Sequence, residues 1–370
     1  MHSRFEFAWF GRSWGSLVTV ESRLKSRPVL GLDISATAVR VVELSRVGVS
    51  YRVESYAVEP LPADAIGEQH LADVETAGVA VRRAYQRCGS RLKSAAVAID
   101  AANAIIRTLQ LPAGLSSREQ EEQVEVLAAR HIPYPLEEVA WDYEVLGPSL
   151  QPPGSEDVLL VAARRDHIEH RQAILEIAGL EARVMDCEVF ALENAYGLVR
   201  GQIANGASVT AFANFGTAST NFSFFDGKRI VYTREQAFGS RQLVDEIMRR
   251  YDLSYEDAVA DLRQGDLPRD YREEVLDPFV TDMALQTNRA LQFFLASTSE
   301  HASVDQVVLC GSSAAIPGAA ERIASQIGKP TVAANPLAEL ELGERVRAQG
   351  IERDAPALMV ACGLALRSFD

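Results

Sequence analysis

Short apolar runs that end in small-residue turns are the main pattern of the chain. Positions 29–34 are apolar except for Asp33, three small residues follow, and positions 39–44 resume with mainly β-branched residues. Apolar runs of this length beside turn residues are typical of buried strands. Positions 208–228 repeat the plan, with Asn-Phe-Gly closing the first run and an Asp-Gly turn signal closing the second. The pattern therefore predicts two strand–turn–strand hairpins of one design.

The rest of the chain alternates predicted strands with amphipathic helices. Positions 304–319 are typical of a buried strand, a small-residue turn and a helix start, and positions 278–299 of a long helix. A capping box at Ser116 and Glu119 opens another helix. The order β-β-β-α-β-α, given twice with an insert in the first half, indicates a two-lobed α/β fold. The stripe of the long helix that should face the core is Val280, Met283, Thr287, Leu291 and Phe294.

Composition and charge exclude some classes of function. The 370 residues have room for two domains, and a hydrophobic content of 47% is ample for buried cores. The formal net charge of −14 argues against nucleic-acid binding. The four cysteines lack metal-ligand spacing, so we expect buried thiols in a reducing compartment. No apolar run is as long as a membrane span, so action at a membrane would require a partner.

Positions 1–28 differ from the rest of the chain. Aromatic and basic side chains crowd this segment, and it lacks the continuous apolar stretch of a signal peptide. We favour a disordered N-terminal extension over a segment that docks on a membrane surface or on a partner.

The two hairpin turns are candidate sites of chemistry. Small turns of this kind can direct backbone N–H groups and Ser or Thr hydroxyls at an anion. Asp33, at the end of a buried strand, requires a cation or hydrogen-bond donors. The first turn alone is compatible with a phosphate loop beside a metal ion or with an ordinary hairpin capped by Asp33; no Walker loop is present. Because the second turn repeats the design, we favour two related halves that face each other across a phosphate.

Several runs of sequence resemble one known family. The runs 32–35, 42–46, 51–56, 232–236 and 363–370 look like those of the PilM family of type IV pilus assembly proteins, within the actin/Hsp70-like ATPase superfamily. The resemblance identifies the two hairpin turns and the small-residue turn after the later strand as phosphate 1, phosphate 2 and adenosine motifs. It implies a two-lobed actin/Hsp70-like (ribonuclease H-like) ATPase fold, in the FtsA-like variant with an inserted α/β subdomain.

The resemblance and the element order together divide the chain. We expect an extension at 1–28, a first actin-like half at 29–200 with the insert at about 92–165, and a second half at 201–370. The insert would replace the small subdomain that is usual in actin.

By position, the resemblance implies a site for ATP and Mg²⁺, with Asp33 as the carboxylate on the metal side and no catalytic residue assigned. Small residues in the adenosine turn would let a ring or ribose approach the backbone closely. The implied cofactor-binding residues are Asp33, Ser35, Ala36, Thr37 and Arg40 in the first loop, Asn214, Gly216, Thr217, Ala218 and Thr220 in the second, Gly239 and Ser240 at the helix below the ribose, and Gly311, Ser312 and Ser313 in the adenosine turn.

The chain departs from the family pattern at several of these positions. Asn214 replaces an Asp, which weakens the organisation of a metal-bound water and any role as a base. Ser240 and Ser312 each replace the second residue of a Gly-Gly pair. Val259 and Leu262 replace a Glu and a Lys that help to hold the nucleoside. We therefore expect ATP binding more than competent hydrolysis.

The function that the resemblance implies is that of a scaffold. A cytoplasmic protein at the inner-membrane face would bind the cytoplasmic N-terminal peptide of the membrane protein PilN, in a groove between the first-half core and the insert. It would thereby couple pilus motor ATPases to the assembly platform, and its membrane association would come through partners.

Two other classes of function stay open at this stage. One is an active ATPase or small-molecule kinase of the same superfamily, for which Asp100 or Asp186 could be offered as the base. The other is an FtsA-like cell-division protein, although the chain ends directly after a predicted core helix, without the usual amphipathic tether.

Overall fold

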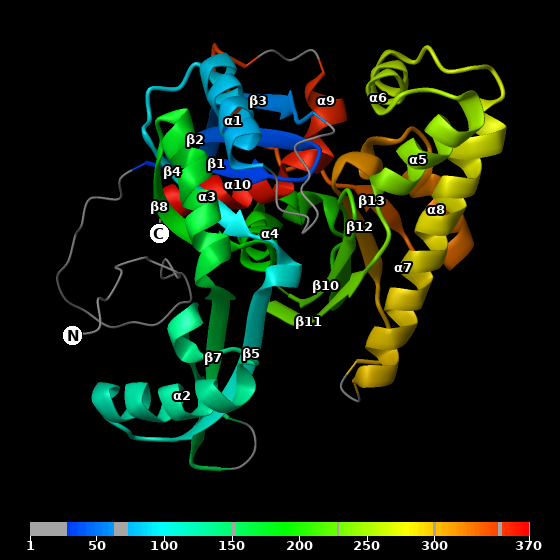
Figure 1. Ribbon diagram of the computed structural model, residues 1–370. Helices are drawn as coiled ribbons and strands as arrows, with labels where there is room; N and C mark the ends of the chain where they lie inside the picture. The colour runs from blue at the N-terminus through cyan, green and yellow to red at the C-terminus, as the bar shows by residue number, and fades with distance from the viewer. Residues whose placement is uncertain are drawn as a thin grey trace.

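The computed structural model describes residues 28–62, 73–149, 153–227, 229–298, 301–346 and 350–369. It has two lobes built on two sheets, with a smaller third sheet extending from the first lobe (Figure 1). The N-terminal segment predicted as an extension, up to residue 27, lies outside the described residues. Among the described residues, no helix is long and apolar enough to cross a bilayer.

The first lobe is built on a six-stranded sheet in the order β14-β3-β2-β1-β4-β8. Helices α1 (Val74–Cys88) and α3 (Arg165–Ala178) share one core with a face of this sheet. The predicted first hairpin is confirmed, because β1 and β2 pair antiparallel around the turn after Ile34. The strands are β1 (Leu30–Ile34), β2 (Ala38–Val47), β3 (Ser50–Pro60), β4 (Ser94–Ile99), β8 (Glu181–Cys187) and β14 (Glu341–Leu342).

The second lobe is built on a five-stranded sheet in the order β11-β10-β9-β12-β13. All five positions of the predicted core-facing stripe on the long helix α7 (Asp277–Ser297) are buried. The strands are β9 (Val209–Phe215), β10 (Thr220–Asp226), β11 (Arg229–Gln236), β12 (Gln306–Cys310) and β13 (Thr331–Ala333). The helices are α5 (Ser240–Tyr251), α6 (Tyr255–Gln264), α7 (Asp277–Ser297) and α8 (Ala319–Ile327), with a π-helical turn at Arg272–Leu276 before α7.

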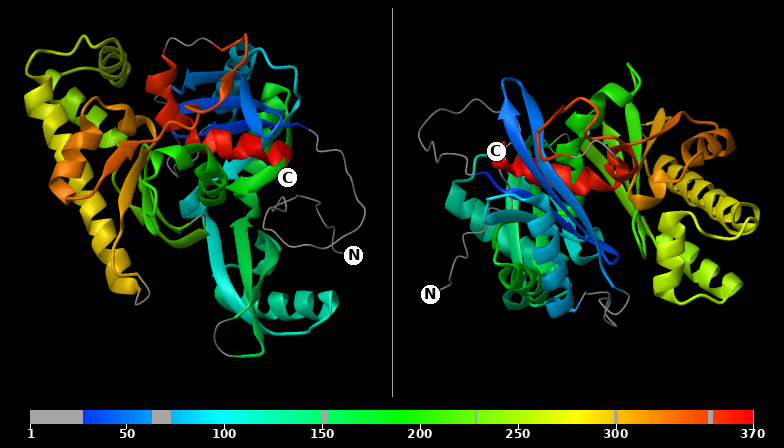
Figure 2. Two further views of the ribbon diagram at one scale, coloured as in Figure 1. Left: turned by 180° about the vertical axis from the view of Figure 1, so that it is seen from behind. Right: turned by 90° about the horizontal axis from the view of Figure 1, so that it is seen from above.

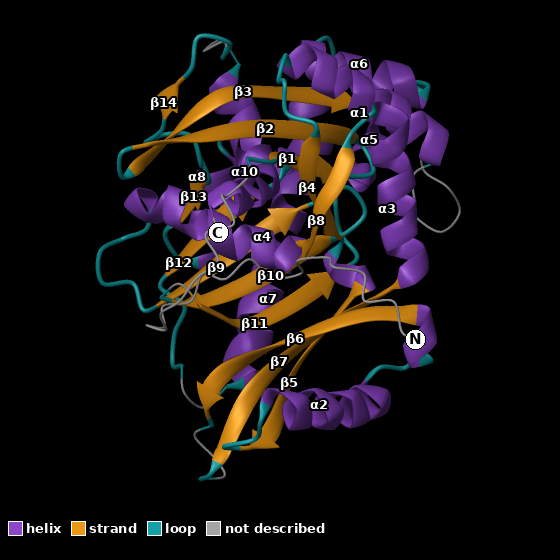
Figure 3. Cartoon of the chain, turned by 90° about the vertical axis from the view of Figure 1, so that its left-hand side faces the viewer, coloured by secondary structure: helices purple, strands orange, loops and turns teal. Residues whose placement is uncertain are grey.

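The insert is a three-stranded antiparallel sheet with α2 (Ser117–His131) on one face (Figure 3). Both hydrogen bonds of the predicted capping box are present at the start of α2. Strand β4 lies within the range expected for the insert, about 92–165, but it pairs with β1 in the first-lobe sheet. The separate sheet therefore begins after β4. Its strands are β5 (Ala104–Pro112), β6 (Val139–Pro148) and β7 (Ser155–Arg164), in the order β5-β7-β6.

Helices α4 (Glu188–Ala195) and α10 (Met359–Ala365) form the layer between the two large sheets (Figure 2). Their apolar side chains share one core with Phe212 of β9 and Val308 of β12. The C-terminal segment thus returns to the first lobe, as does β14, which pairs with β3.

The predicted core helix near the end of the chain is α-helical only over α10, and 3-10 turns flank it. The remaining short elements are the 3-10 turns at Ala101–Asn103, Leu136–Glu138, Tyr196–Gln202, Ser312–Ala315, Ala355–Leu358 and Leu366–Phe369, and α9 (Ile351–Asp354). The four cysteines are free and buried, as expected.

Candidate functional site

The two predicted phosphate turns meet each other across the interface of the lobes. The hydroxyl of Thr37, after β1, lies 3.0 Å from the hydroxyl of Thr217, after β9, and the two share a hydrogen bond. These residues are 180 positions apart in the chain. The fold therefore brings the turns together as the sequence predicts, and it joins them directly.

Asp33 is held by Arg40 from the neighbouring strand. Nη1 of Arg40 donates to Oδ2 of Asp33 at 2.8 Å and to the hydroxyl of Ser35 at 3.2 Å. The register of the hairpin places Asp33 opposite Arg40, so the contact follows from the local pairing of β1 with β2. Burial raises the pKa of the Asp33 carboxyl above its ordinary value, and Arg40 opposes that rise. The predicted partner of Asp33, a cation or hydrogen-bond donors, is thus a side chain of the same hairpin.

The hydroxyl of Ser35 forms all of its hydrogen bonds within the first hairpin. It donates to the carbonyl of Ala38 at 2.9 Å and accepts from the N–H of Ala38 at 3.2 Å. With the contact from Arg40, this hydroxyl has one bond as a donor and two as an acceptor, which fills its hydrogen-bonding capacity.

The start of α5 is hydrogen-bonded to the second turn. The N–H groups of Ser240 and Arg241 donate to the carbonyls of Gly216 and Thr217 at 3.0 and 2.9 Å. A Cβ at Gly239 would overlap those same carbonyl oxygens. Free N–H groups at a helix start are what usually bind a phosphate. Here two of them bind backbone oxygens instead.

The adenosine-like turn packs on the end of β9. Gly311 has a φ of 85°, and its N–H donates to the carbonyl of Pro356 at 2.9 Å. A Cβ at this position would overlap the carbonyl oxygen of Phe215. The glycine is therefore required by internal packing and by its backbone conformation. The hydroxyl of Ser313 is buried and has no hydrogen-bond partner among the described residues.

Glu188, at the start of α4, is a site residue that is absent from the residues predicted from the sequence. Its Oε1 accepts from Nδ2 of Asn214 at 2.6 Å, and its Oε2 accepts weakly from the N–H of Ala101 at 3.4 Å. Burial, with the charges of Asp100 and Asp33, raises the pKa of Glu188 to about 8. At neutral pH this carboxyl is therefore mostly protonated. No motif signalled Glu188, because its role depends on the contact between α4 and β9.

Asp100 is also paired. Nη2 of Arg171, on α3, donates to both carboxylate oxygens of Asp100 at 3.0 Å. Arg171 is 5% exposed, so the guanidinium is fixed in place. Asp100, one of two residues offered as a kinase base, is therefore held by a cation. The other, Asp186, is fully buried and paired with Arg367.

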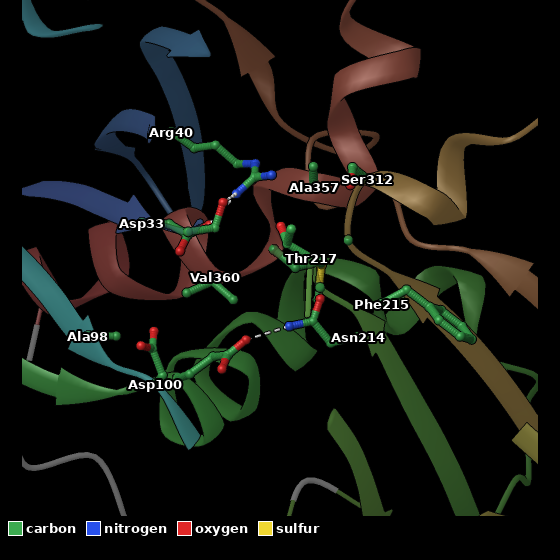
Figure 4. Close-up of a pocket in the computed structure, with 15 residues that line it drawn as sticks. Asp33, Arg40, Ala98, Asp100, Asn214, Phe215, Thr217, Ser312, Ala357 and Val360 are labelled. Carbon is green, nitrogen blue, oxygen red and sulfur yellow. Dashed lines mark hydrogen bonds and ion pairs between the residues drawn. The ribbon is translucent and has the colours of Figure 1, made fainter. Parts of the chain in front are cut away.

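These groups surround a cavity of about 60 Å³ (Figure 4). Sites for small molecules are usually roughly 300–1,000 Å³. The ring of Phe215 points away from the cavity, whereas the side chains of Asp33, Asp100 and Asn214 gather around it. The described residues that line it are Asp33, Ser35, Arg40, Ala98, Asp100, Glu188, Asn214, Phe215, Gly216, Thr217, Gly311, Ser312, Ala357, Met359 and Val360.

Some of the predicted site residues lie outside this lining. The second turn is contacted across the interface by Thr37, and at the start of α5 by Gly239 and Ser240, as described above. The hydroxyl of Thr220 donates to the carbonyl of Phe238 at 2.6 Å. The other residues outside the lining are Ala36, Ala218 and Ser313. The substituted positions Val259 and Leu262 on α6 pack against the apolar core of the second lobe.

The pKa of Glu188 predicts a pH dependence of stability. A carboxyl whose pKa is raised on folding contributes stability that is complete below its unfolded pKa of about 4.5 and is lost as the pH rises through about 8. The charged groups acting on it are Asp100, Asp33 and Glu235. We expect the wild type to lose about 2–3 kcal/mol relative to Glu188→Gln between about pH 5.5 and about pH 8.5.

Urea unfolding of both proteins at each pH measures this difference. Glu193, whose pKa burial raises to about 7, titrates in both proteins and cancels. Parallel pH profiles for the two proteins would show that Glu188 is ionised when folded.

The described architecture defines an actin-like protein, with two lobes, paired hairpin turns and an insert in the first lobe. The family model of "Type IV pilus assembly protein PilM" matches residues 31–369, and the chain belongs to this family. Similar solved structures show the same fold.

One is a "PilM-PilN type IV pilus biogenesis complex", with a TM-score of 0.77 and 24% identity over 93% of this chain and 99% of that one. Another is the ethanolamine utilization protein EutJ from Carboxydothermus hydrogenoformans, with a TM-score of 0.51 and 16% identity over 94% of this chain and 92% of that one.

Proposed function

We propose that this protein is a scaffold of type IV pilus assembly, and that it binds the cytoplasmic N-terminal peptide of a PilN-type membrane protein beside its insert. Membership of the family supports the pilus role. The similar solved complex contains PilM and PilN, which supports the kind of partner. The observation that carries the binding mode is the face of the insert sheet that α2 leaves uncovered.

The strand registers show which residues lie on that face. Leu159 of β7 lies between Thr108 of β5 and Glu144 of β6, and Val161 lies between Ile106 and Asp142. Cross-strand neighbours share a face of a sheet. Val161 is buried in the first-lobe core, and Leu159 is only half-buried at its edge. The opposite face is covered by α2.

We infer that the peptide lies between the first-lobe core and the insert, along the row of Thr108, Leu159 and Glu144. This row holds a half-buried leucine and Glu144, and a second carboxylate, Asp142, lies in the neighbouring row opposite Val161. Partial burial raises the pKa of Asp142. Cytoplasmic segments next to a membrane span carry an excess of Lys and Arg. A basic, partly apolar peptide complements this row in charge and polarity.

The insert sheet also offers backbone groups. Strands β5 and β6 are its two edges, and each pairs on one side only among the described residues. An extended peptide can add to such an edge through main-chain hydrogen bonds, while side chains set the specificity.

The carboxylates give a direct test of the site. We expect Asp142→Asn with Glu144→Gln to weaken the binding of a synthetic PilN N-terminal peptide about tenfold, since each charge pair at a partly exposed site contributes about 0.5–1 kcal/mol. Calorimetric titration gives the Kd. The matched control is Glu121→Gln with Glu125→Gln, which removes two charges from α2. If both double variants bind the peptide equally, the proposed face is not the binding site.

The remaining expectations stay predictions: coupling to motor ATPases and a cytoplasmic location at the inner-membrane face. The small volume of the cavity does not favour ATP as a ligand of the cleft. An active ATPase or kinase is less well supported. Asn214 is bonded to a mostly protonated Glu188, and Asp100 is held by Arg171. Asp186, the other residue offered as a base, is paired with Arg367, so we propose peptide binding rather than catalysis.

A further inference from the structure

We infer that in this chain the Arg40 guanidinium takes the place of the divalent cation that the fold class implies for the cleft, so that the closed cleft is held together without Mg²⁺. The inference concerns the interface of the lobes and is independent of peptide binding at the insert.

The first support is the charge balance around the cavity. Asp33 is paired with Arg40, and Asp100 with Arg171. Arg40 is the only cationic side chain among the described residues that line the cavity. Mg²⁺ is normally held through one or two carboxylates together with phosphate oxygens and waters. Here the carboxylate at the expected metal position already has a cation 2.8 Å away.

The second support is the burial of that pair. The side chains of Arg40 and Asp33 are 8% and 17% exposed. A metal ion at Asp33 would displace Arg40 into surroundings where an unpaired guanidinium is costly. Arg40 also binds Ser35, so its displacement would break a second hydrogen bond. The two cations therefore exclude each other at Asp33.

The third support is that the phosphate turns are tied to the protein itself. Thr37 binds Thr217 across the interface, and the first N–H groups of α5 bind the carbonyls of the second turn. A nucleotide phosphate between the turns would have to break the contact between the two threonines. Hydrogen bonds of the protein itself therefore lie where a metal ion and a phosphate would otherwise join the two lobes.

Thermal unfolding of the full chain tests the inference, with EDTA, MgCl2, MnCl2 and Mg-ATP as additives. We expect the wild-type Tm to stay within about 1 °C across all four, because a ligand stabilises only the form that binds it. We expect Arg40→Gln, which frees Asp33, to gain a Tm rise of several degrees with MnCl2 that EDTA reverses. The matched control is Arg52→Gln, which breaks the exposed pair with Glu341 and should remain insensitive.

Each outcome decides the question. A wild-type Tm that rises with Mg-ATP and falls back with EDTA would overturn the inference. So would a folded Arg40→Gln protein that ignores MnCl2, because Arg40 would then not be what excludes the cation. If Arg40→Gln does not fold, Arg40→Ala takes its place, and if neither folds, the wild-type comparison decides alone.

Discussion

Gly363→Ala is expected to destabilise the protein by about 3 kcal/mol or more. Gly363 lies in α10, and a Cβ there would overlap the carbonyl oxygen of Ala191 in α4. The obstacle is backbone in the layer between the lobes, so it cannot rotate away as a side chain could. The neighbouring residues Met359 and Val360 line the cavity, so a shift of α10 would also disturb the cleft.

Gly197→Ala is the matched control for this change. Gly197 lies in a 3-10 turn after α4, and a Cβ there would meet no atom within 4 Å. We expect the free energy of unfolding of Gly197→Ala to differ from that of the wild type by less than about 1 kcal/mol. The change should be a rise and not a fall, because alanine restricts the unfolded chain. Urea unfolding followed by circular dichroism compares the two. Equal stabilities would contradict the close packing of α10 on α4.

Arg367→Met is the second change with a large expected effect. Nε of Arg367 lies 2.7 Å from Oδ2 of Asp186, and the two side chains are 5% and 0% exposed. Oδ1 of Asp186 also accepts from the N–H of Cys187 at 2.8 Å. Removing the cation leaves a carboxylate in the interior, which costs about 3–5 kcal/mol. The measured quantity is the free energy of unfolding in urea.

Two further proteins separate the ion pair from the loss of an arginine in general. Arg52→Met breaks the exposed contact with Glu341 and is expected to cost less than about 1 kcal/mol. The double change Asp186→Leu with Arg367→Met removes both charges and should recover most of the lost stability. A double variant as unstable as Arg367→Met would show that packing of the arginine stem, and not its charge, holds the C-terminal segment.

Most helices and strands of the fold could be predicted from the local pattern of apolar and polar residues. The hairpin at β1–β2 and the buried stripe of α7 rest on short-range periodicity, and the capping box of α2 on residues three apart. The return of the C-terminal segment to the first lobe departs from the predicted second half at 201–370, because pairing of β14 with β3 joins residues far apart in sequence. The same limit explains why β4 was assigned to the insert when it belongs to the first-lobe sheet.

In the candidate site, too, features that depend on neighbouring residues could be predicted, and those that depend on distant residues could not. The buried position of Asp33 predicts a cation or hydrogen-bond donors beside it, and the identity of that partner follows only from the pairing of Asp33 with Arg40 across β1 and β2. Glu188 was missed, because nothing local marks it and its pKa depends on burial between the lobes. The shared design of the two turns predicts that they face each other across a phosphate, whereas the direct hydrogen bond between Thr37 and Thr217 is known only from the structure.

Calorimetric titration of the full chain with a synthetic PilN N-terminal peptide, once in EDTA and once with Mg-ATP, tests the account most directly. A scaffold whose cleft closes without a divalent cation should bind the peptide in EDTA with a micromolar Kd, and Mg-ATP should change that Kd by less than about twofold. No binding in either condition would contradict the scaffold function. Binding only with Mg-ATP would keep the partner and contradict the metal-free cleft.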